Sequence, residues 1–73
     1  MKIISFNINS IRARPHQIEH LRDTLDPDVI GLQETKVNDP EFPIDVINEI
    51  GYHAEFWGQK GHYGVAILSK NKP

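Results

Sequence analysis

The sequence has no cysteine, and this absence excludes both a disulfide framework and a zinc-thiolate site. It also lacks the long hydrophobic stretch of a signal peptide, because the first two residues lead directly into a short apolar run. No segment approaches the length that a membrane span requires. We therefore expect a protein of a reducing compartment, located in the cytoplasm and not associated with a membrane.

Positive charge is also scarce. Eight Lys and Arg residues stand against ten Asp and Glu residues, so the formal net charge is -2. Proteins that bind polyanions indiscriminately usually carry a basic excess, which displaces counterions from phosphates. The charge balance argues against that class of protein, although it leaves room for a local basic patch.

The chain is short, and 73 residues allow at most one domain. Its 38% hydrophobic and 25% charged residues are typical of a soluble globular protein. The chain ends just after a hydrophobic strand, with no further segment to cover the outer edge of that strand. We therefore expect residues 1–73 to be one partial domain, the N-terminal segment of a larger one, that folds incompletely alone.

Residues 2–10 alternate in polarity with the period of two that is typical of a strand. The apolar face carries Ile4, Phe6 and Ile8, and the polar face carries Ser5, Asn7 and Asn9. Pro15 suits the first position of a helix, and this helix would place Ile18, Leu21 and Leu25 on its apolar face.

A second strand is predicted over Val29–Leu32, a short apolar run that we expect to be buried on both faces. Because a helix connects it to the first strand, the two strands should be parallel. A second helix is predicted over Ile44–Ile50, with Gly51 as its cap. The apolar side of this second helix is expected to consist of Val46, Ile47 and Ile50.

Two further strands, over residues 52–58 and 63–70, should form a hairpin through residues 59–62. Gly64 and Ala66 would lie on one face of the last strand, where small residues let another layer approach. The sequence thus predicts an α/β fold with the element order β-α-β-α-β-β.

Two polar residues follow the predicted parallel strands, Asn7 after the first and Glu34 after the second. Ligands of open α/β sheets bind beyond the carboxyl ends of such strands. If the strands are neighbours, an amide oxygen and a carboxylate could share one Mg²⁺ ion, which keeps waters and phosphate oxygens in its other positions. Alternatively, Asn7 only makes turn hydrogen bonds and Glu34 is only solvated, and spacing alone favours this alternative.

Four of the eight basic residues lie where predicted strands end, namely Arg12, Arg14, Lys36 and Lys60. Cations clustered on loops would suit a phosphate backbone, although Lys and Arg are common in any exposed loop.

His16 and His20 have the spacing of a metal-binding pair, but without a third ligand a solvated helix face is the better interpretation. Among the aromatic residues, we expect Trp57 in the core and leave Tyr63 open between core packing and base stacking.

Three motifs carry a family resemblance, namely SFNINSIRARP, DVIGLQETK and GQKGHYGVAILSK, in this order and separation. The chain resembles the N-terminal part of the exonuclease III family, the bacterial apurinic/apyrimidinic (AP) endonucleases. Ser10 stands where this family often has glycine. The resemblance implies the endonuclease/exonuclease/phosphatase fold, a four-layer α/β sandwich in which two sheets pack together with helices outside.

The resemblance also implies a monomeric enzyme that hydrolyses double-stranded DNA 5′ to abasic sites and removes nucleotides from 3′ ends. Magnesium is the implied cofactor, with manganese as a substitute, and the implied metal-binding residues are Glu34 and Asn7. Arg12 matches a position near the DNA backbone, and Tyr63 lies in a loop that borders the groove.

The family's catalytic base, histidine and tyrosine come from segments beyond residue 73, so no catalytic residue is assigned and the isolated chain is expected to be inactive. Two alternatives stay open. One is a noncatalytic α/β fragment that binds nucleic acid. The other is a different branch of the superfamily, acting on phosphoinositides, RNA tails or lipid phosphodiesters.

Overall fold

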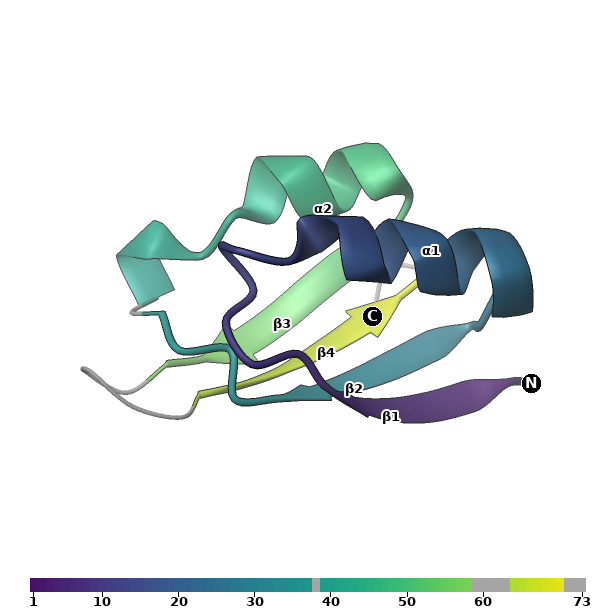
Figure 1. Cartoon of the computed structure of the whole chain (residues 1–73), viewed down its shortest axis with the longest axis horizontal. Coiled ribbons are helices and arrows are strands. Elements are labelled where there is room, and N and C mark those ends of the chain that lie inside the picture. Colours follow the sequence, from purple (N-terminus) through teal and green to yellow (C-terminus); the bar gives the residue numbers. More distant parts are fainter. Residues whose placement is uncertain (38, 59–63, 71–73) are drawn as a thin grey trace.

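The computed structural model describes residues 1–37, 39–58 and 64–70 (Figure 1). The predicted order of helices and strands is confirmed, with a short 3-10 turn before the second helix. The elements are β1 (Ile3–Asn7), α1 (Pro15–Leu25), β2 (Val29–Gln33), η1 (Asp39–Glu41), α2 (Ile44–Ile50), β3 (His53–Trp57) and β4 (Val65–Ser69). Within these residues, neither helix is long and apolar enough to cross a membrane.

The four strands form one sheet in the order β1-β2-β4-β3. As predicted, β1 and β2 are parallel, and β3 and β4 pair antiparallel. β1 and β2 are also direct neighbours, the condition on which a shared metal site depended. β4 also pairs with β2, so it is an interior strand and the sheet edges are β1 and β3. The expectation that the last strand has an uncovered outer edge is therefore wrong, because β4 inserts between two earlier strands.

Both helices cover the same face of the sheet (Figure 1). Alternate strand residues point toward them, including Ile30 and Leu32 of β2, which are at most 1% exposed.

Gly51 ends α2 in the left-handed conformation, as predicted. Two helix predictions are wrong, since Leu25 is 43% exposed and Val46 is 40% exposed. Leu25 is the last residue of its helix, and the short α2 buries only Ile47 and Ile50.

The other face of the sheet has no helix over it in the described part of the chain (Figure 1). The prediction that β2 is buried on both faces is therefore wrong, because Val29 and Gly31 remain half-buried. Trp57 is 53% exposed, so its predicted core position is also wrong. Its direct cross-strand partner is Val65, and this register places both side chains on the uncovered face.

Candidate metal and nucleic-acid site

Asn7 and Glu34 lie side by side at the carboxyl ends of β1 and β2. The parallel register pairs Asn7 with Gln33, so Glu34 is the next residue beyond the strand. The side-chain amide of Asn7 donates a hydrogen bond to Oε2 of Glu34. The backbone continues this pairing past the strands, because the Ser10 N–H donates to the Glu34 carbonyl at 2.9 Å. The proximity predicted from the sequence is therefore present in the fold.

The turn interpretation of Asn7 also holds in part. Oδ1 of Asn7 accepts the backbone N–H of Asn9 at 3.1 Å, which is the local hydrogen bond of a strand-ending turn. A side-chain carbonyl oxygen has two lone pairs, so one remains for another partner. Asn7 thus ends its strand and orients Glu34 with the same amide group.

The loops at this edge contain strained backbone. Asn9, Ser10, Glu34 and Lys36 all have positive φ angles, between 47° and 86°, although none is glycine. Each such residue costs on the order of 1 kcal/mol or more, and strain of this kind concentrates at functional sites. The conformation of Glu34 is therefore held by its surroundings, not by its own preference.

Lys36 and Arg14 both bind Asn9, a residue that the sequence did not single out as functional. Nζ of Lys36 lies 2.6 Å from Oδ1 of Asn9 and 3.7 Å from Oε1 of Glu34. Nε of Arg14 donates to the carbonyl of Asn9 at 3.1 Å. One feature of the sequence could have identified Asn9 as functional. It lies two positions after Asn7, on the same face of the predicted strand. Asn9 thus joins two predicted DNA-binding cations to the edge that carries Glu34.

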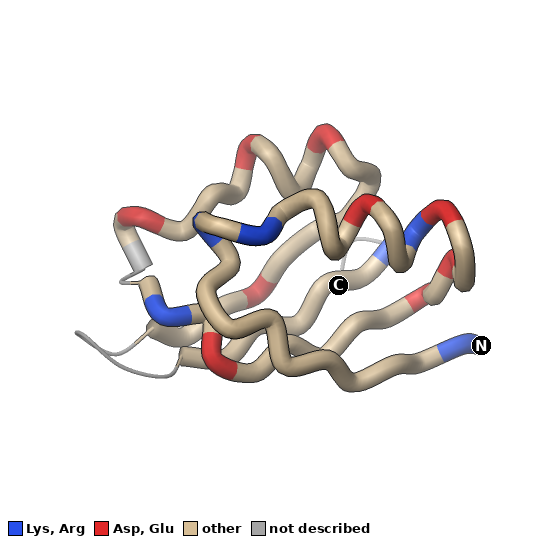
Figure 2. The backbone as a smooth tube through the Cα atoms, viewed as in Figure 1, with Lys and Arg blue, Asp and Glu red and all other residues tan. Residues whose placement is uncertain are grey.

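Arg12, another predicted DNA-binding residue, is not part of this network. Arg12 forms an ion pair with Glu41 at 2.8 Å, with both side chains more than half exposed. Lys60 and Tyr63 lie outside the described residues. Figure 2 shows basic positions on the loops after β1 and β2, with the acidic Glu34 directly after β2, whereas other acidic positions lie on the two helices, the turns near them and β3. The loop edge is thus locally more basic than the chain as a whole.

The donor set at this edge fits a hard divalent cation. Glu34 offers a carboxylate whose side chain is 31% exposed, and Asn7 offers an amide oxygen. Mg²⁺ commonly takes only one or two protein oxygen ligands and fills its other positions with water or phosphate oxygen. Among residues 1–37, 39–58 and 64–70, no cluster of three or more His, Cys, Asp or Glu could hold a metal alone. The pair therefore suits a shared site with waters and substrate, not a closed structural one.

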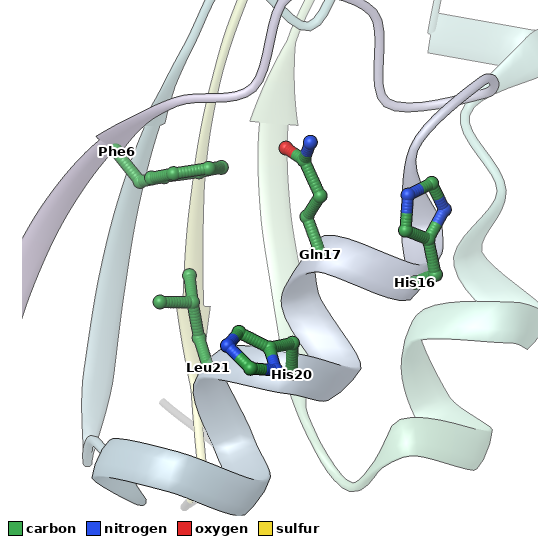
Figure 3. Close-up of a pocket in the computed structure, with 5 residues that line it drawn as sticks. All are labelled: Phe6, His16, Gln17, His20 and Leu21. Atoms are coloured by element: carbon green, nitrogen blue, oxygen red, sulfur yellow. The ribbon is translucent and has the colours of Figure 1, made fainter.

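A pocket of about 530 Å³ lies elsewhere, between β1 and α1 (Figure 3). Phe6, His16, Gln17, His20 and Leu21 line it. The two histidines lie on the solvated helix face that the sequence predicted, and no third metal ligand joins them among the described residues. Phe6 faces the helices, whereas its neighbour Asn7 faces the opposite side of the strand. The pocket is thus separate from the Asn7–Glu34 pair.

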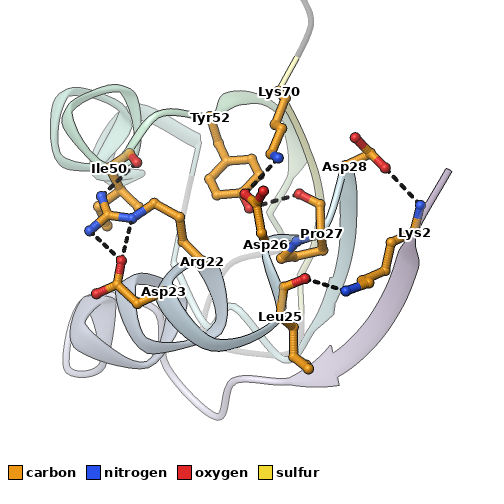
Figure 4. Close-up of polar contacts among 10 residues, drawn as sticks. All are labelled: Lys2, Arg22, Asp23, Leu25, Asp26, Pro27, Asp28, Ile50, Tyr52 and Lys70. Atoms are coloured by element: carbon orange, nitrogen blue, oxygen red, sulfur yellow. Dashed lines mark hydrogen bonds and ion pairs between the residues drawn. The ribbon is translucent and has the colours of Figure 1, made fainter.

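The opposite end of the sheet carries another polar network, which fastens the helices to the strands (Figure 4). The hydroxyl of the buried Tyr52 donates to the Pro27 carbonyl at 2.8 Å, and burial raises the pKa of that hydroxyl. Arg22 donates to the carbonyl of Ile50, at the end of α2, at 2.8 Å. These groups are bonded to one another or to backbone, so we assign this end a structural role.

Known proteins similar to this chain include exodeoxyribonucleases. Exodeoxyribonuclease III of Haemophilus influenzae is 59% identical over all 73 residues, which cover 27% of that protein. An exodeoxyribonuclease of Bacillus subtilis is 38% identical, with 100% of this chain and 29% of the relative covered. The chain thus spans about a quarter of the length of these relatives.

Solved structures that superpose on this chain include an AP endonuclease and a 3′ phosphatase. An AP endonuclease from Archaeoglobus fulgidus superposes with a TM-score of 0.92 at 45% identity, covering 100% of this chain and 28% of that one. The 3′ phosphatase NExo from Neisseria, bound to product DNA hairpin, has a TM-score of 0.89 at 38% identity, with the same coverage. Residues 4–73 match the Endonuclease/Exonuclease/phosphatase family. The chain therefore belongs to the endonuclease/exonuclease/phosphatase family.

Proposed function

We propose that this chain forms the metal-facing and phosphate-facing part of a magnesium-dependent nuclease that acts on double-stranded DNA at abasic sites and 3′ ends. The observation that carries the proposal is the Asn7–Glu34 pair at the carboxyl ends of two parallel strands, with Lys36 beside it. The names of the relatives, exodeoxyribonucleases and AP endonucleases, support the choice of DNA as the substrate.

The proposed chemistry assigns a separate task to each residue at this edge. Bound Mg²⁺ supplies the positive charge that polarises a phosphodiester and stabilises the leaving oxygen. Glu34 offers a carboxylate ligand, which the amide of Asn7 holds in place. Lys36 and Arg14 provide cationic donors for phosphate oxygens of the DNA backbone.

A general base is not assigned within the described residues. His16 and His20 line the separate pocket, and His53 begins β3 at the end of the sheet away from Asn7. We therefore propose that residues 1–73 alone do not turn over substrate. An assay of the 73-residue chain on an abasic duplex with Mg²⁺ tests this, and turnover like that of a whole relative would contradict it.

A chimaera provides the test of the metal role. Residues 1–73 replace the matching segment of the H. influenzae enzyme, to which they are 59% identical. We expect cleavage of an abasic duplex with Mg²⁺, and a loss of at least about 100-fold in Glu34→Gln, since metal-dependent charge stabilisation is a large term. The control is Glu49→Gln, an exposed carboxylate on α2 that should leave activity unchanged. Full activity of Glu34→Gln would refute the metal role.

A second candidate is a noncatalytic nucleic-acid-binding segment, and the gathering of Lys36 and Arg14 on Asn9 favours it. DNA binding by the 73-residue chain that weakens steeply with salt, without cleavage in the chimaera, would support this candidate. The proposal further includes a monomeric, cytoplasmic whole protein. Sedimentation of the whole protein and fractionation of cells test these two properties.

A further inference from the structure

The segment of residues 34–36 is held from two sides, although it is not itself a strand. On one side, the Ser10 N–H donates to the Glu34 carbonyl at 2.9 Å, and the Ile11 N–H donates to the Thr35 carbonyl at 3.0 Å. On the other side, the Thr35 N–H donates to the Gly64 carbonyl at 3.2 Å. The residue next to Glu34 is thus bound both to the loop after β1 and to the residue that precedes β4.

Thr35 and Gly64 are also in close contact through the threonine side chain. Thr35 is a buried polar residue, with only 1% of its surface exposed. A Cβ atom placed on Gly64 would clash with Oγ1 of Thr35, far inside any van der Waals contact. Gly64 also has a φ of 66°, which L side chains rarely adopt. The expectation that Gly64 lets another layer approach is therefore corrected, because the group that approaches is Thr35.

This contact acts on the two strained residues that flank Thr35. Glu34 has a φ of 55° and Lys36 a φ of 56°, so the backbone of each is strained and would gain free energy by relaxing to an ordinary conformation. A change of φ at Glu34 would move the Thr35 side chain out of its buried position. It would also break the hydrogen bonds that Thr35 makes to Ile11 and Gly64. Packing of Thr35 therefore opposes relaxation of Glu34.

We infer that Gly64 is a positioning residue for Glu34. The missing side chain at position 64 lets Thr35 pack in place, and Thr35 keeps the Glu34 backbone left-handed with its carboxylate at the Asn7 amide. The inference rests on the proposed function, since it concerns the same carboxylate. On this inference Gly64 influences metal affinity through Thr35, although it has no side chain that could supply a ligand atom.

The test measures Mn²⁺ affinity in the chimaera by electron paramagnetic resonance, together with cleavage of an abasic duplex. Gly64→Ala should weaken Mn²⁺ binding by about tenfold, the scale of a lost outer-shell contact at a metal site. Thr35→Ala should also weaken binding, because Glu34 can then relax. In the double variant, the methyl group added at position 64 occupies the space that the Thr35 side chain leaves, so we expect binding tighter than in either single variant.

The matched control is Gly51→Ala. Gly51 also has a positive φ, of 114°, but no atom lies within 4 Å of the place that its Cβ would take. This variant should lose stability through backbone strain while keeping wild-type Mn²⁺ affinity at a temperature where the fold is intact. The comparison separates strain from positioning of the carboxylate.

The outcomes distinguish this inference from the proposed function. Unchanged affinity in Gly64→Ala, with reduced affinity in Glu34→Gln, would overturn the positioning role and leave the proposed function standing. Unchanged affinity in Glu34→Gln would overturn both. If Gly64→Ala does not fold, the comparison of Thr35→Ala with the double variant decides: tighter binding by the double variant supports the inference, and equal or weaker binding overturns it.

Discussion

The amide of Asn7 donates a hydrogen bond to the carboxylate of Glu34, although 27 positions separate these residues in the chain. The parallel pairing of β1 and β2 creates this contact, because it brings the carboxyl ends of both strands to the same edge. The contact orients one carboxylate oxygen toward an amide and leaves the other facing the ammonium group of Lys36. Substitutions in the chimaera can test this arrangement and the fold that supports it.

Replacement of Asn7 by Asp should make the stability of the fold more sensitive to divalent metal. The variant loses a hydrogen-bond donor to Glu34 and places two carboxylates together, which destabilises the metal-free protein by about 1–3 kcal/mol. A divalent cation neutralises that repulsion. Melting temperatures with EDTA and with Mg²⁺ should therefore differ more in Asn7→Asp than in the wild type. An equal Mg²⁺ response in both proteins would contradict a metal site at this pair.

Removal of the Lys36 charge should raise the affinity for metal and weaken the binding of DNA. Nζ of Lys36 lies 3.7 Å from Glu34, so Lys36→Gln removes a cation that competes for the same carboxylate. We expect Mn²⁺ affinity to rise about two- to tenfold. The slope of the logarithm of DNA affinity against the logarithm of salt concentration should fall in magnitude by about one. Lys70→Gln is the control, because Lys70 pairs with Asp26 at the other end of the sheet. Similar effects in both variants would indicate a nonspecific change of net charge.

Substitution of Ser10 by glycine should stabilise the protein. Ser10 has a φ of 86°, a left-handed conformation that glycine adopts without strain. The relief of strain exceeds the extra entropy of the unfolded chain, so we expect a gain of about 0.5–1 kcal/mol. Chemical denaturation measures this gain. Ser69→Gly, within β4, should instead lose stability, and a loss in both variants would show that the Ser10 turn is not strained.

Alanine substitutions in β4 test whether a second sheet packs on the uncovered face. Leu68 is fully buried beneath the helices, so Leu68→Ala should cost about 2–5 kcal/mol. Ile67 points to the other face and is 46% exposed in this chain. If the four-layer sandwich forms in the chimaera, Ile67→Ala should cost a similar amount. A cost below about 0.5 kcal/mol, typical of an exposed position, would show that this face stays open.

Asp28 should contribute to stability only above its folded-state pKa. The Lys2 backbone N–H donates to its carboxylate at 2.7 Å, and this bond lowers the pKa of Asp28. A lowered pKa gives stability that is present above the unfolded-state value of about 3.9 and is lost as the pH falls through the folded-state value. Asp28→Asn keeps an acceptor for Lys2 but does not ionise. Its melting temperature should therefore fall less between about pH 5 and pH 2.5 than that of the wild type.

Local sequence patterns determined the elements of this fold. Pro15 and Gly51 mark the start of α1 and the end of α2, and the polarity period of residues 2–10 correctly indicates β1. The sequence also placed Asn7 and Glu34 at the ends of two predicted parallel strands, whereas their proximity depended on these strands being neighbours, which the fold shows. The elements and their ends depend on residues close in sequence, whose effects on the backbone are short-ranged.

Only the tertiary structure decided the strand order, the exposure of each face and the support of Glu34. β4 inserts between β2 and β3, and no local pattern reports which strands become neighbours. Trp57 is exposed because its side chain lies on the face of the sheet that no helix covers among the described residues. The Thr35–Gly64 contact joins residues 29 positions apart and exists because one lacks the side chain that would clash with the other. Local propensity favours helices and strands in the sequence, whereas burial and steric fit are set by which distant segments pack together, and this is visible only in the tertiary structure.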